Sequence, residues 1–176
     1  STPSKDLPKE NFSTLRSIAP LDGSWEVAFD EKRGGPGAVV FETLIDWTQH
    51  PDERVRHYSG IATYRKTFDC PTATGPVLLD IGEIPGLARI RLNGHELGVL
   101  WCAPWRLDIT AAVKPTGNQL EIDVANRWPN RLIGDSALPE EQRIAWTTWS
   151  PYKPDSPLLS SGLLGPVQLM TREDKH

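Results

Sequence analysis

Residues 77–126 decide the fold class, and they read VLLDIGEIPGLARIRLNGHELGVLWCAPWRLDITAAVKPTGNQLEIDVAN. Apolar and polar residues alternate there in short runs, as in strands that bury one face and expose the other. Asn93-Gly94 stands between two of these runs, and this pair favours a tight hairpin because a type I′ turn needs a positive φ at both central positions. The segment therefore predicts antiparallel strands joined by short turns.

The alternation continues on both sides of this segment. Strands are expected at Gly23–Phe29, Ala38–Leu44, Ile61–Phe68, 77–81, 88–92, Glu96–Trp101, Trp105–Thr110, Gln119–Asn126 and Gly165–Met170. Where the pattern is clearest they recur about every 8–12 residues, which is typical of sandwiches and jelly rolls. We therefore predict an all-β fold, an antiparallel β-sandwich of the jelly-roll type, over residues 21–172.

Residues 1–20 have a different composition, with low hydrophobicity, three prolines and no period. They predict a linker or an N-terminal arm. The chain begins with Ser-Thr-Pro-Ser and has no charged-then-apolar leader. We therefore expect a fragment or a processed chain whose targeting information lies elsewhere.

The charge and the hydropathy exclude two classes of partner. The chain has 19 Lys and Arg against 23 Asp and Glu, a net charge of −4, which removes the electrostatic basis for a dedicated nucleic-acid-binding protein. Its apolar runs are far shorter than the roughly 18 residues that cross a bilayer. We expect neither nucleic acid nor a membrane as a partner.

The alternation disappears over residues 127–164. Such a long connection is uncommon unless it has a function. Trp128, Trp146, Trp149 and Tyr152 lie there among five prolines. A helical turn is expected around Pro139–Arg143, with proline in the first turn and acidic residues near the N-terminus.

Several motifs follow one another in a fixed order along the chain. They are YRKTF, the Asn93-Gly94 turn, the Gly98–Trp105 segment, DIT at Asp108–Thr110 and the Gly117-Asn118 turn. In this order they resemble the sugar-binding jelly-roll domain of family 2 glycoside hydrolases. NRLIGD at Asn130–Asp135 and SGLLGPV at Ser161–Val167 resemble more specifically the β-sandwich near the C-terminus of bacterial family 106 α-L-rhamnosidase-type proteins.

This resemblance covers about residues 21–170 and implies a galactose-binding-like β-sandwich. It also implies a larger polysaccharide-degrading enzyme, located outside the cell or in the periplasm, that carries its catalytic carboxylates and calcium site in a separate barrel domain. Nothing in this chain matches those catalytic and calcium residues. The implied partners are the catalytic domain of that enzyme and a plant polysaccharide or oligosaccharide.

The tryptophans give the strongest indication of a binding site, because sugar rings stack on aromatic faces while fixed polar groups bind their hydroxyls. Trp25 and Trp47 have apolar surroundings in the pattern and are predicted to lie in the core. The candidate ligand-binding residues are Trp101, Trp105, Asn130, Arg131, Trp146, Trp149 and Tyr152. They are expected at a loop edge, because the strand faces are committed to the core and to charged residues. Packing within the core or the loop is the alternative for each aromatic residue, and Asn130 and Arg131 could equally pin the loop to the sandwich.

Two motifs that suggest hydrolysis have simpler interpretations. Glu121 and Asp123 lie two apart on one strand face, where a solvated surface pair is a better interpretation than a glycosidase pair. Gly134–Leu138 (GDSAL) resembles the GDSL-type esterases, but no base accompanies Ser136. Asp135 and Ser136 are instead expected to offer turn or capping oxygens to backbone N–H groups. We predict no catalytic residue in this chain.

The sequence contains few signals of a metal site or of a disulfide. The histidines lack the spacing of a transition-metal site, and exposed loop positions are expected for His50, His57, His95 and His176. No cofactor is evident, although a structural calcium ion stays open because such sites leave no spacing signature. Cys70 and Cys102 are expected to be two separate buried thiols, with a single disulfide as the alternative.

We therefore predict a non-catalytic carbohydrate-binding or accessory domain of a bacterial, α-L-rhamnosidase-like glycoside hydrolase that acts on plant polysaccharides. The alternative is a structural module that packs on a catalytic domain and binds no sugar itself. An autonomous hydrolase is the third and weakest interpretation.

Overall fold

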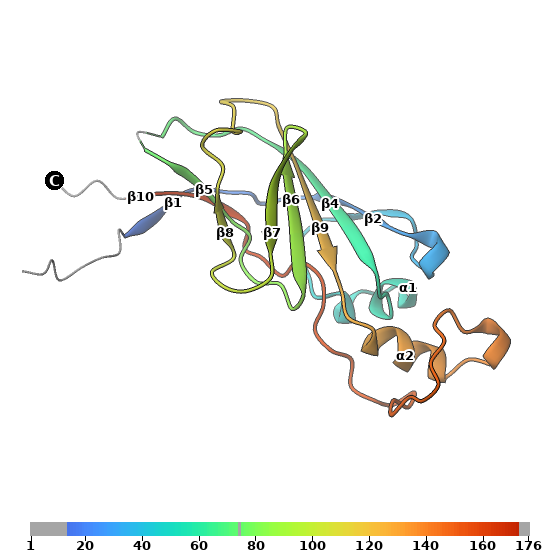
Figure 1. The fold of residues 1–176 in the computed structure, drawn as a ribbon. Helices are drawn as coiled ribbons and strands as arrows, with labels where there is room; N and C mark the ends of the chain where they lie inside the picture. Colours follow the sequence, from blue (N-terminus) through green and yellow to red (C-terminus); the bar gives the residue numbers. More distant parts are fainter. Residues whose placement is uncertain (1–13, 74, 173–176) are drawn as a thin grey trace, which may run out of the picture.

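The strands form two antiparallel sheets that pack face to face (Figure 1). The computed structural model describes residues 14–73 and 75–172. The four-stranded sheet has the order β1-β10-β5-β8, and the six-stranded sheet has the order β3-β2-β4-β9-β6-β7. Every neighbouring pair of strands is antiparallel. This arrangement confirms the predicted all-β sandwich.

The alternation in the sequence locates most of the strands. Their bounds are β1 Leu15–Pro20, β2 Trp25–Phe29, β3 Ala38–Phe41, β4 Ile61–Phe68, β5 Val77–Asp80, β6 Leu87–Leu92, β7 His95–Leu100, β8 Arg106–Asp108, β9 Asn118–Ala125 and β10 Gln168–Arg172. All except β1 overlap a strand expected from the sequence. Asn93 and Gly94 have φ angles of 53° and 81°, as the predicted tight hairpin requires.

The expected N-terminal arm, residues 1–20, includes residues that form strand β1 in the structure. Residues 15–20 pair with β10 along the edge of the four-stranded sheet. The register shifts between Ser17 and Ala19, so consecutive apolar residues do not alternate, and this irregularity hid the strand from the pattern. Ile18 and Ala19 pack against the core. Residues 1–13, the rest of that arm, lie outside the described residues.

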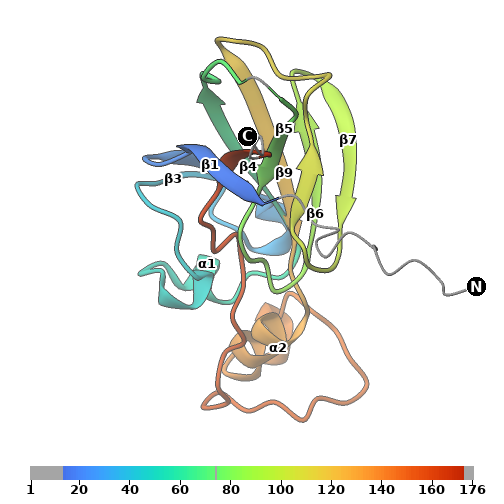
Figure 2. The same cartoon turned by 90° about the vertical axis from the view of Figure 1, so that its left-hand side faces the viewer.

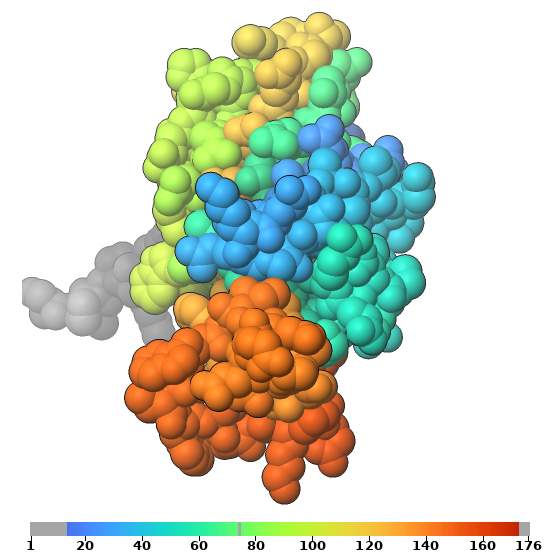
Figure 3. Space-filling view, turned by 90° about the vertical axis from the view of Figure 1, so that its right-hand side faces the viewer, coloured from blue at the N-terminus to red at the C-terminus, as the bar shows by residue number. Residues whose placement is uncertain are grey.

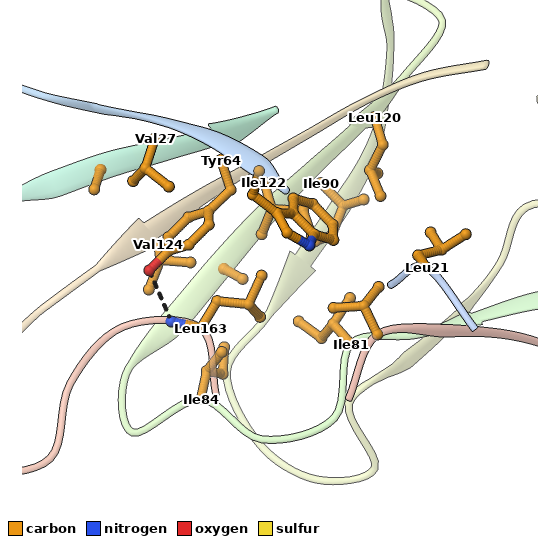
Figure 4. Close-up of a cluster of buried hydrophobic side chains, with 14 of the residues drawn as sticks. Leu21, Val27, Tyr64, Ile81, Ile84, Ile90, Leu120, Ile122, Val124 and Leu163 are labelled. Carbon is orange, nitrogen blue, oxygen red and sulfur yellow. Dashed lines mark hydrogen bonds between the residues drawn. The ribbon is translucent and has the colours of Figure 1, made fainter. Parts of the chain in front are cut away.

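The core fills the space between the sheets and includes Trp25 and Trp47, which confirms both predictions. Trp47 Nε1 donates a hydrogen bond to the Tyr64 hydroxyl at 2.6 Å. The same oxygen accepts the N–H of Leu163 at 3.2 Å (Figure 4). Burial raises the pKa of Tyr64, so the phenol stays neutral in the core. This buried polar chain fastens the segment that precedes β10 to the six-stranded sheet.

The outer face of the six-stranded sheet carries a ladder of charges. Arg65 lies between Glu26 and Glu121, at 3.2 and 3.0 Å. Arg91 lies between Glu121 and Asp123, at 2.8 and 2.7 Å. Hydrogen bonds from Arg91 and then Arg65 lower the pKa of Glu121. The acidic residues of β9, Glu121 and Asp123, are therefore paired with arginines on the sheet surface.

The same outer face becomes apolar nearer the helices. Ala125 of β9 pairs with Ile61 of β4 on one side and with Leu87 of β6 on the other. Residues that are directly opposite in antiparallel strands project to one face, and Ile61 and Leu87 are exposed. The expectation that charged residues occupy the whole outer face was therefore wrong, because it ignored the strand ends.

Both α-helices lie at one end of the sandwich, opposite the Asn93-Gly94 turn (Figures 1 and 2). They are α1 Glu53–Arg56 and α2 Pro129–Ser136, and the 3₁₀ turns are η1 Glu31–Arg33, η2 Trp47–Gln49 and η3 Glu140–Gln142. Turn η3 confirms the helical turn expected around Pro139–Arg143. Within the described ranges, no helix is long and apolar enough to span a bilayer.

Candidate functional site

Helix α2 occupies the start of a segment that the sequence predicted to be irregular. Pro129 stands in its first turn, where the missing N–H costs nothing. Gly134 lies inside the helix, where a Cβ would come within 2.7 Å of the His57 ring. Proline, asparagine and glycine are weak helix formers, so this stretch gives no helical signal on its own. Contacts with residues distant in the sequence therefore stabilise α2, and α2 in turn positions the other parts of the candidate site.

Asn130 ties α2 to the far end of the long loop. Its Nδ2 donates to the Leu159 carbonyl at 2.7 Å, and its Oδ1 accepts the Leu159 N–H at 2.8 Å. The side chain is buried. These contacts join two parts of the same long loop and leave the Asn130 amide occupied by the Leu159 backbone.

Arg131 and Asp135 form a buried charged pair on the same helix, with Nη2 and Oδ1 3.0 Å apart. Arg131 Nε and Asp135 Oδ1 make no hydrogen bond within the described residues. Burial lowers the pKa of the nearby His57, and the positive charges of Arg131 and Arg56 lower it further. The base of the long loop therefore contains the guanidinium of Arg131, whose hydrogen-bonding capacity the described residues satisfy only in part.

The other carboxylate oxygen of Asp135 holds the loop backbone. Oδ2 accepts the N–H groups of Ile144 at 3.1 Å and Ala145 at 2.7 Å. The Ser136 hydroxyl instead donates to the Ile133 carbonyl at 2.6 Å. The expectation that both side chains offer oxygens to backbone N–H groups is thus confirmed for Asp135 and wrong for Ser136. Both side chains therefore form hydrogen bonds with backbone groups of this chain.

The segment held by Asp135 forms one wall of a pocket of about 350 Å³, here called the loop pocket. The indole of Trp146 is 80% exposed at its rim. The pocket is lined by Leu132, Asp135, Ser136, Glu140, Arg143, Ile144, Ala145, Trp146, Thr147, Ser150 and Tyr152. Two aromatic rings, several hydroxyl groups, two acidic residues and one arginine thus meet in one concavity, a combination suited to a polar ring such as a sugar.

Two of the seven predicted ligand-binding residues, Trp146 and Tyr152, line the loop pocket. Trp149 is 74% exposed on the same loop but is not part of the lining. Asn130 and Arg131 are buried in α2 and also lie outside the lining.

Trp101 and Trp105 are not brought to the loop pocket. Trp101 follows β7 and is 74% exposed. Trp105 packs against the core, and its carbonyl accepts the N–H of Ile81 at 2.9 Å. The sequence could not distinguish these two positions, because their different depths depend on contacts with other strands.

Two histidines depart from the exposed positions expected of them. His50 is half-buried and stacks on Phe41, with ring centroids 5.2 Å apart. His57 is half-buried beneath α2, whereas His95 is exposed. His176 lies outside the described residues.

The cysteines are separate, as expected, but neither is buried. Cys70 is half-buried, Cys102 is exposed, and both are free thiols. Among the residues that the structure describes, no group of three His, Cys, Asp or Glu side chains is placed to hold a metal ion.

Comparison with known proteins identifies the family of this chain. The family model for the glycosyl hydrolase 2 galactose-binding domain-like domain matches residues 45–152. A putative β-glucuronidase of Formosa agariphila is 35% identical over 193 aligned positions, which include 93% of this chain and 17% of that protein. The chain therefore spans about one sixth of the length of this curated relative.

Solved structures agree with the family match. The rhamnosidase from Novosphingobium sp. PP1Y is 41% identical with a TM-score of 0.85, and the match covers 96% of this chain and 16% of that one. A β-glucuronidase from Ruminococcus gnavus has a TM-score of 0.60 at 20% identity, over 93% of this chain and 30% of that one, and supports the fold alone. On the family match, which spans more than half of its residues, the chain belongs to the galactose-binding-like domains of glycosyl hydrolase family 2.

Proposed function

We propose that this chain is a non-catalytic, carbohydrate-binding accessory domain of a larger rhamnosidase- or glucuronidase-like glycoside hydrolase, and that the loop pocket contacts the glycan. The short span relative to the rhamnosidase and the putative β-glucuronidase supports a place within a larger enzyme. A plant polysaccharide as the glycan, and a location outside the cytoplasm, belong to the same proposal.

The observation that carries this proposal is the position of Trp146. A large aromatic ring that is 80% exposed costs solvation free energy unless something covers it. Thr147, Ser150 and Tyr152, which carry hydroxyl groups, line the same pocket as that ring. One face of a sugar could stack on the indole while its hydroxyls pair with these groups, which is how concave sites select a polar ring.

The same pocket is poorly equipped for hydrolysis. Asp135 and Glu140 both line it, but Asp135 is buried and its Oδ2 already accepts two backbone N–H groups. A carboxylate in that position is held in place by the loop and does not attack a substrate or relay a proton. Binding is therefore the activity that this geometry supports.

An affinity gel or glycan array with the purified chain tests the proposal, and the panel should include rhamnose-containing pectic glycans. Trp146→Ala should weaken retention about five- to tenfold, the worth of one aromatic contact, with the unfolding midpoint unchanged. Trp101→Ala is the matched control, because Trp101 has a similar exposure and lies outside the loop pocket. Retention that both substitutions weaken equally, or no retention of any glycan, would contradict the proposal.

A second function, docking onto another domain, is favoured by the apolar row of Ile61, Ala125 and Leu87. Exposed apolar residues side by side on a sheet are typical of surfaces that another protein covers. Leu87→Lys should leave the isolated chain as stable as before and should lower the unfolding temperature of the full-length parent enzyme. Equal unfolding temperatures for the two full-length proteins would contradict docking at this row.

A further inference from the structure

A second pocket lies on the other side of the segment that Asp135 holds. It has a volume of about 380 Å³ and is here called the Trp128 pocket. Ile144 and Ala145 line both pockets, so this two-residue segment separates them. In Figure 3 the blue segment that contains η1 lies directly against the orange segment of α2 and its loop, and these two segments supply all the lining residues of this pocket except Ser59.

The wall of the Trp128 pocket is mainly cationic. It contains Lys32, Arg33 and Arg131 but only one carboxylate, that of Asp30. Asp30 Oδ1 already accepts the backbone N–H of Lys32, and its other oxygen is 3.7 Å from Arg33 Nε. Lys32 and Arg33 are exposed, and their ammonium and guanidinium groups can turn toward a ligand.

Arg131 is the buried element of this wall. It is 7% exposed, and its Nε makes no hydrogen bond within the described part of the chain. A guanidinium with an unused donor is costly to bury. An anion in the pocket would compensate the part of the Arg131 charge that Asp135 leaves unsatisfied.

Trp128 adds an aromatic face to the cationic wall. Its side chain is 57% exposed and precedes Arg131 by three residues, so the two lie on one side of the first helical turn. Trp128 occupies the N-cap position without a side-chain capping hydrogen bond. Its exposed indole is available to stack on a sugar ring.

We propose that the Trp128 pocket binds an acidic sugar residue, with its carboxylate facing Arg131, Lys32 and Arg33 and its ring stacked on Trp128. This inference rests on the proposed carbohydrate-binding function, and it adds a second subsite with a defined charge preference. An uncharged sugar would gain the aromatic contact alone, whereas a uronate would also gain charge-assisted hydrogen bonds.

Titration of the chain with methyl β-D-glucuronide and methyl β-D-glucoside, followed by NMR of the tryptophan indole N–H signals, tests this inference. The glucuronide should shift the Trp128 signal and bind roughly tenfold more tightly than the glucoside, an advantage that added salt reduces. Lys32→Ala combined with Arg33→Ala should reduce this preference severalfold, leaving only the contribution of Arg131. Arg54→Ala is the matched control, since Arg54 is an exposed, ion-paired arginine outside the pocket.

The two proposals fail in different ways. If the loop pocket binds no sugar, the Trp146 signal stays still while the Trp128 signal still moves with the glucuronide. If the Trp128 pocket has no preference for acid, the two glycosides bind equally there and the double substitution changes nothing. Binding of glucose 6-sulfate without binding of the glucuronide would also overturn the assignment to a uronate.

Discussion

The carboxylate of Asp135 accepts the backbone N–H of Ala145 at 2.7 Å, across ten residues of chain. This hydrogen bond positions the segment that separates the loop pocket from the Trp128 pocket. One buried side chain on α2 therefore determines the shape of both concavities.

Asp135→Ala should destabilise the chain by about 3 kcal/mol, because it leaves Arg131 buried without its partner and two N–H groups without their acceptor. The loss should appear in the denaturant midpoint and in faster amide exchange at Ile144 and Ala145. Ser136→Ala is the control and should cost about 1 kcal/mol or less, since only one hydrogen bond to a carbonyl is lost. Equal losses for the two variants would show that Asp135 does not hold the segment.

Much of the fold followed from period-two alternation, and the exceptions have physical causes. Strand β4 was predicted with the bounds that the structure shows, Ile61–Phe68, because its neighbours bury only one of its faces. Strand β1 was missed because its register shifts at Ser17. Helix α2 was missed because Pro129 and Gly134 oppose the helical signal, and only contacts with distant residues such as His57 reveal why they are tolerated.

Gly82→Ala should be far more damaging than Gly117→Ala. Both glycines have a positive φ, 72° and 66°, so both substitutions pay the strain of the left-handed region, about 1–2 kcal/mol. Only at Gly82 would the new Cβ collide with the backbone of Gly165, whereas a Cβ added at Gly117 would meet no atom of the described residues within 4 Å other than those of its chain neighbours. We expect a Gly82→Ala protein that is destabilised by at least about 3 kcal/mol or does not fold, as judged by thermal unfolding.

A similar loss of stability in the two glycine variants would mean that backbone strain alone decides the effect. The close approach of residues 82 and 165 joins β5 to the segment before β10 through an isolated bridge. A larger loss of stability in Gly82→Ala would therefore support the bridge that holds the end of the long loop against the sheet.

The stability of the chain should fall as the pH drops below about 6.5, the ordinary pKa of histidine. Burial, followed by the charges of Arg131 and Arg56, lowers the pKa of His57 in the folded state, and Glu53 opposes this shift. Below 6.5 the unfolded chain binds the proton more tightly than the folded chain, so stability decreases until the pH reaches the lower folded-state pKa.

The unfolding temperature should therefore fall as the pH is lowered through this range, and His57→Gln should remove this slope of unfolding temperature against pH. His95 is exposed, and His95→Gln is the control that should leave the slope intact. The paired carboxylate of Glu121 titrates below its ordinary value of 4.5, so its effect falls outside this window. An unchanged slope in His57→Gln would place the titrating group elsewhere.

The candidate site was only partly predictable, because sequence does not report which polar residue is buried. The aromatic content of residues 127–164 drew attention to Trp146 and Tyr152, which line the loop pocket. The same reasoning included Asn130, whose partner Leu159 lies 29 residues away. It also omitted Trp128, because its proximity to Lys32 and Arg33 depends on how the η1 turn packs against α2.

The isolated chain should not hydrolyse aryl glycosides or aryl acetates. The acidic residues of β9 are paired with Arg65 and Arg91, and Asp135 is buried under the loop backbone that it binds. A glycosidase needs one carboxyl group to donate a proton and a second to attack or to activate water, and these carboxylates are not free for either task. Release of nitrophenol from a glycoside panel should equal the buffer rate. Turnover that survives purification and disappears in Glu140→Gln would show that the loop pocket is catalytic and that the accessory role was assigned wrongly.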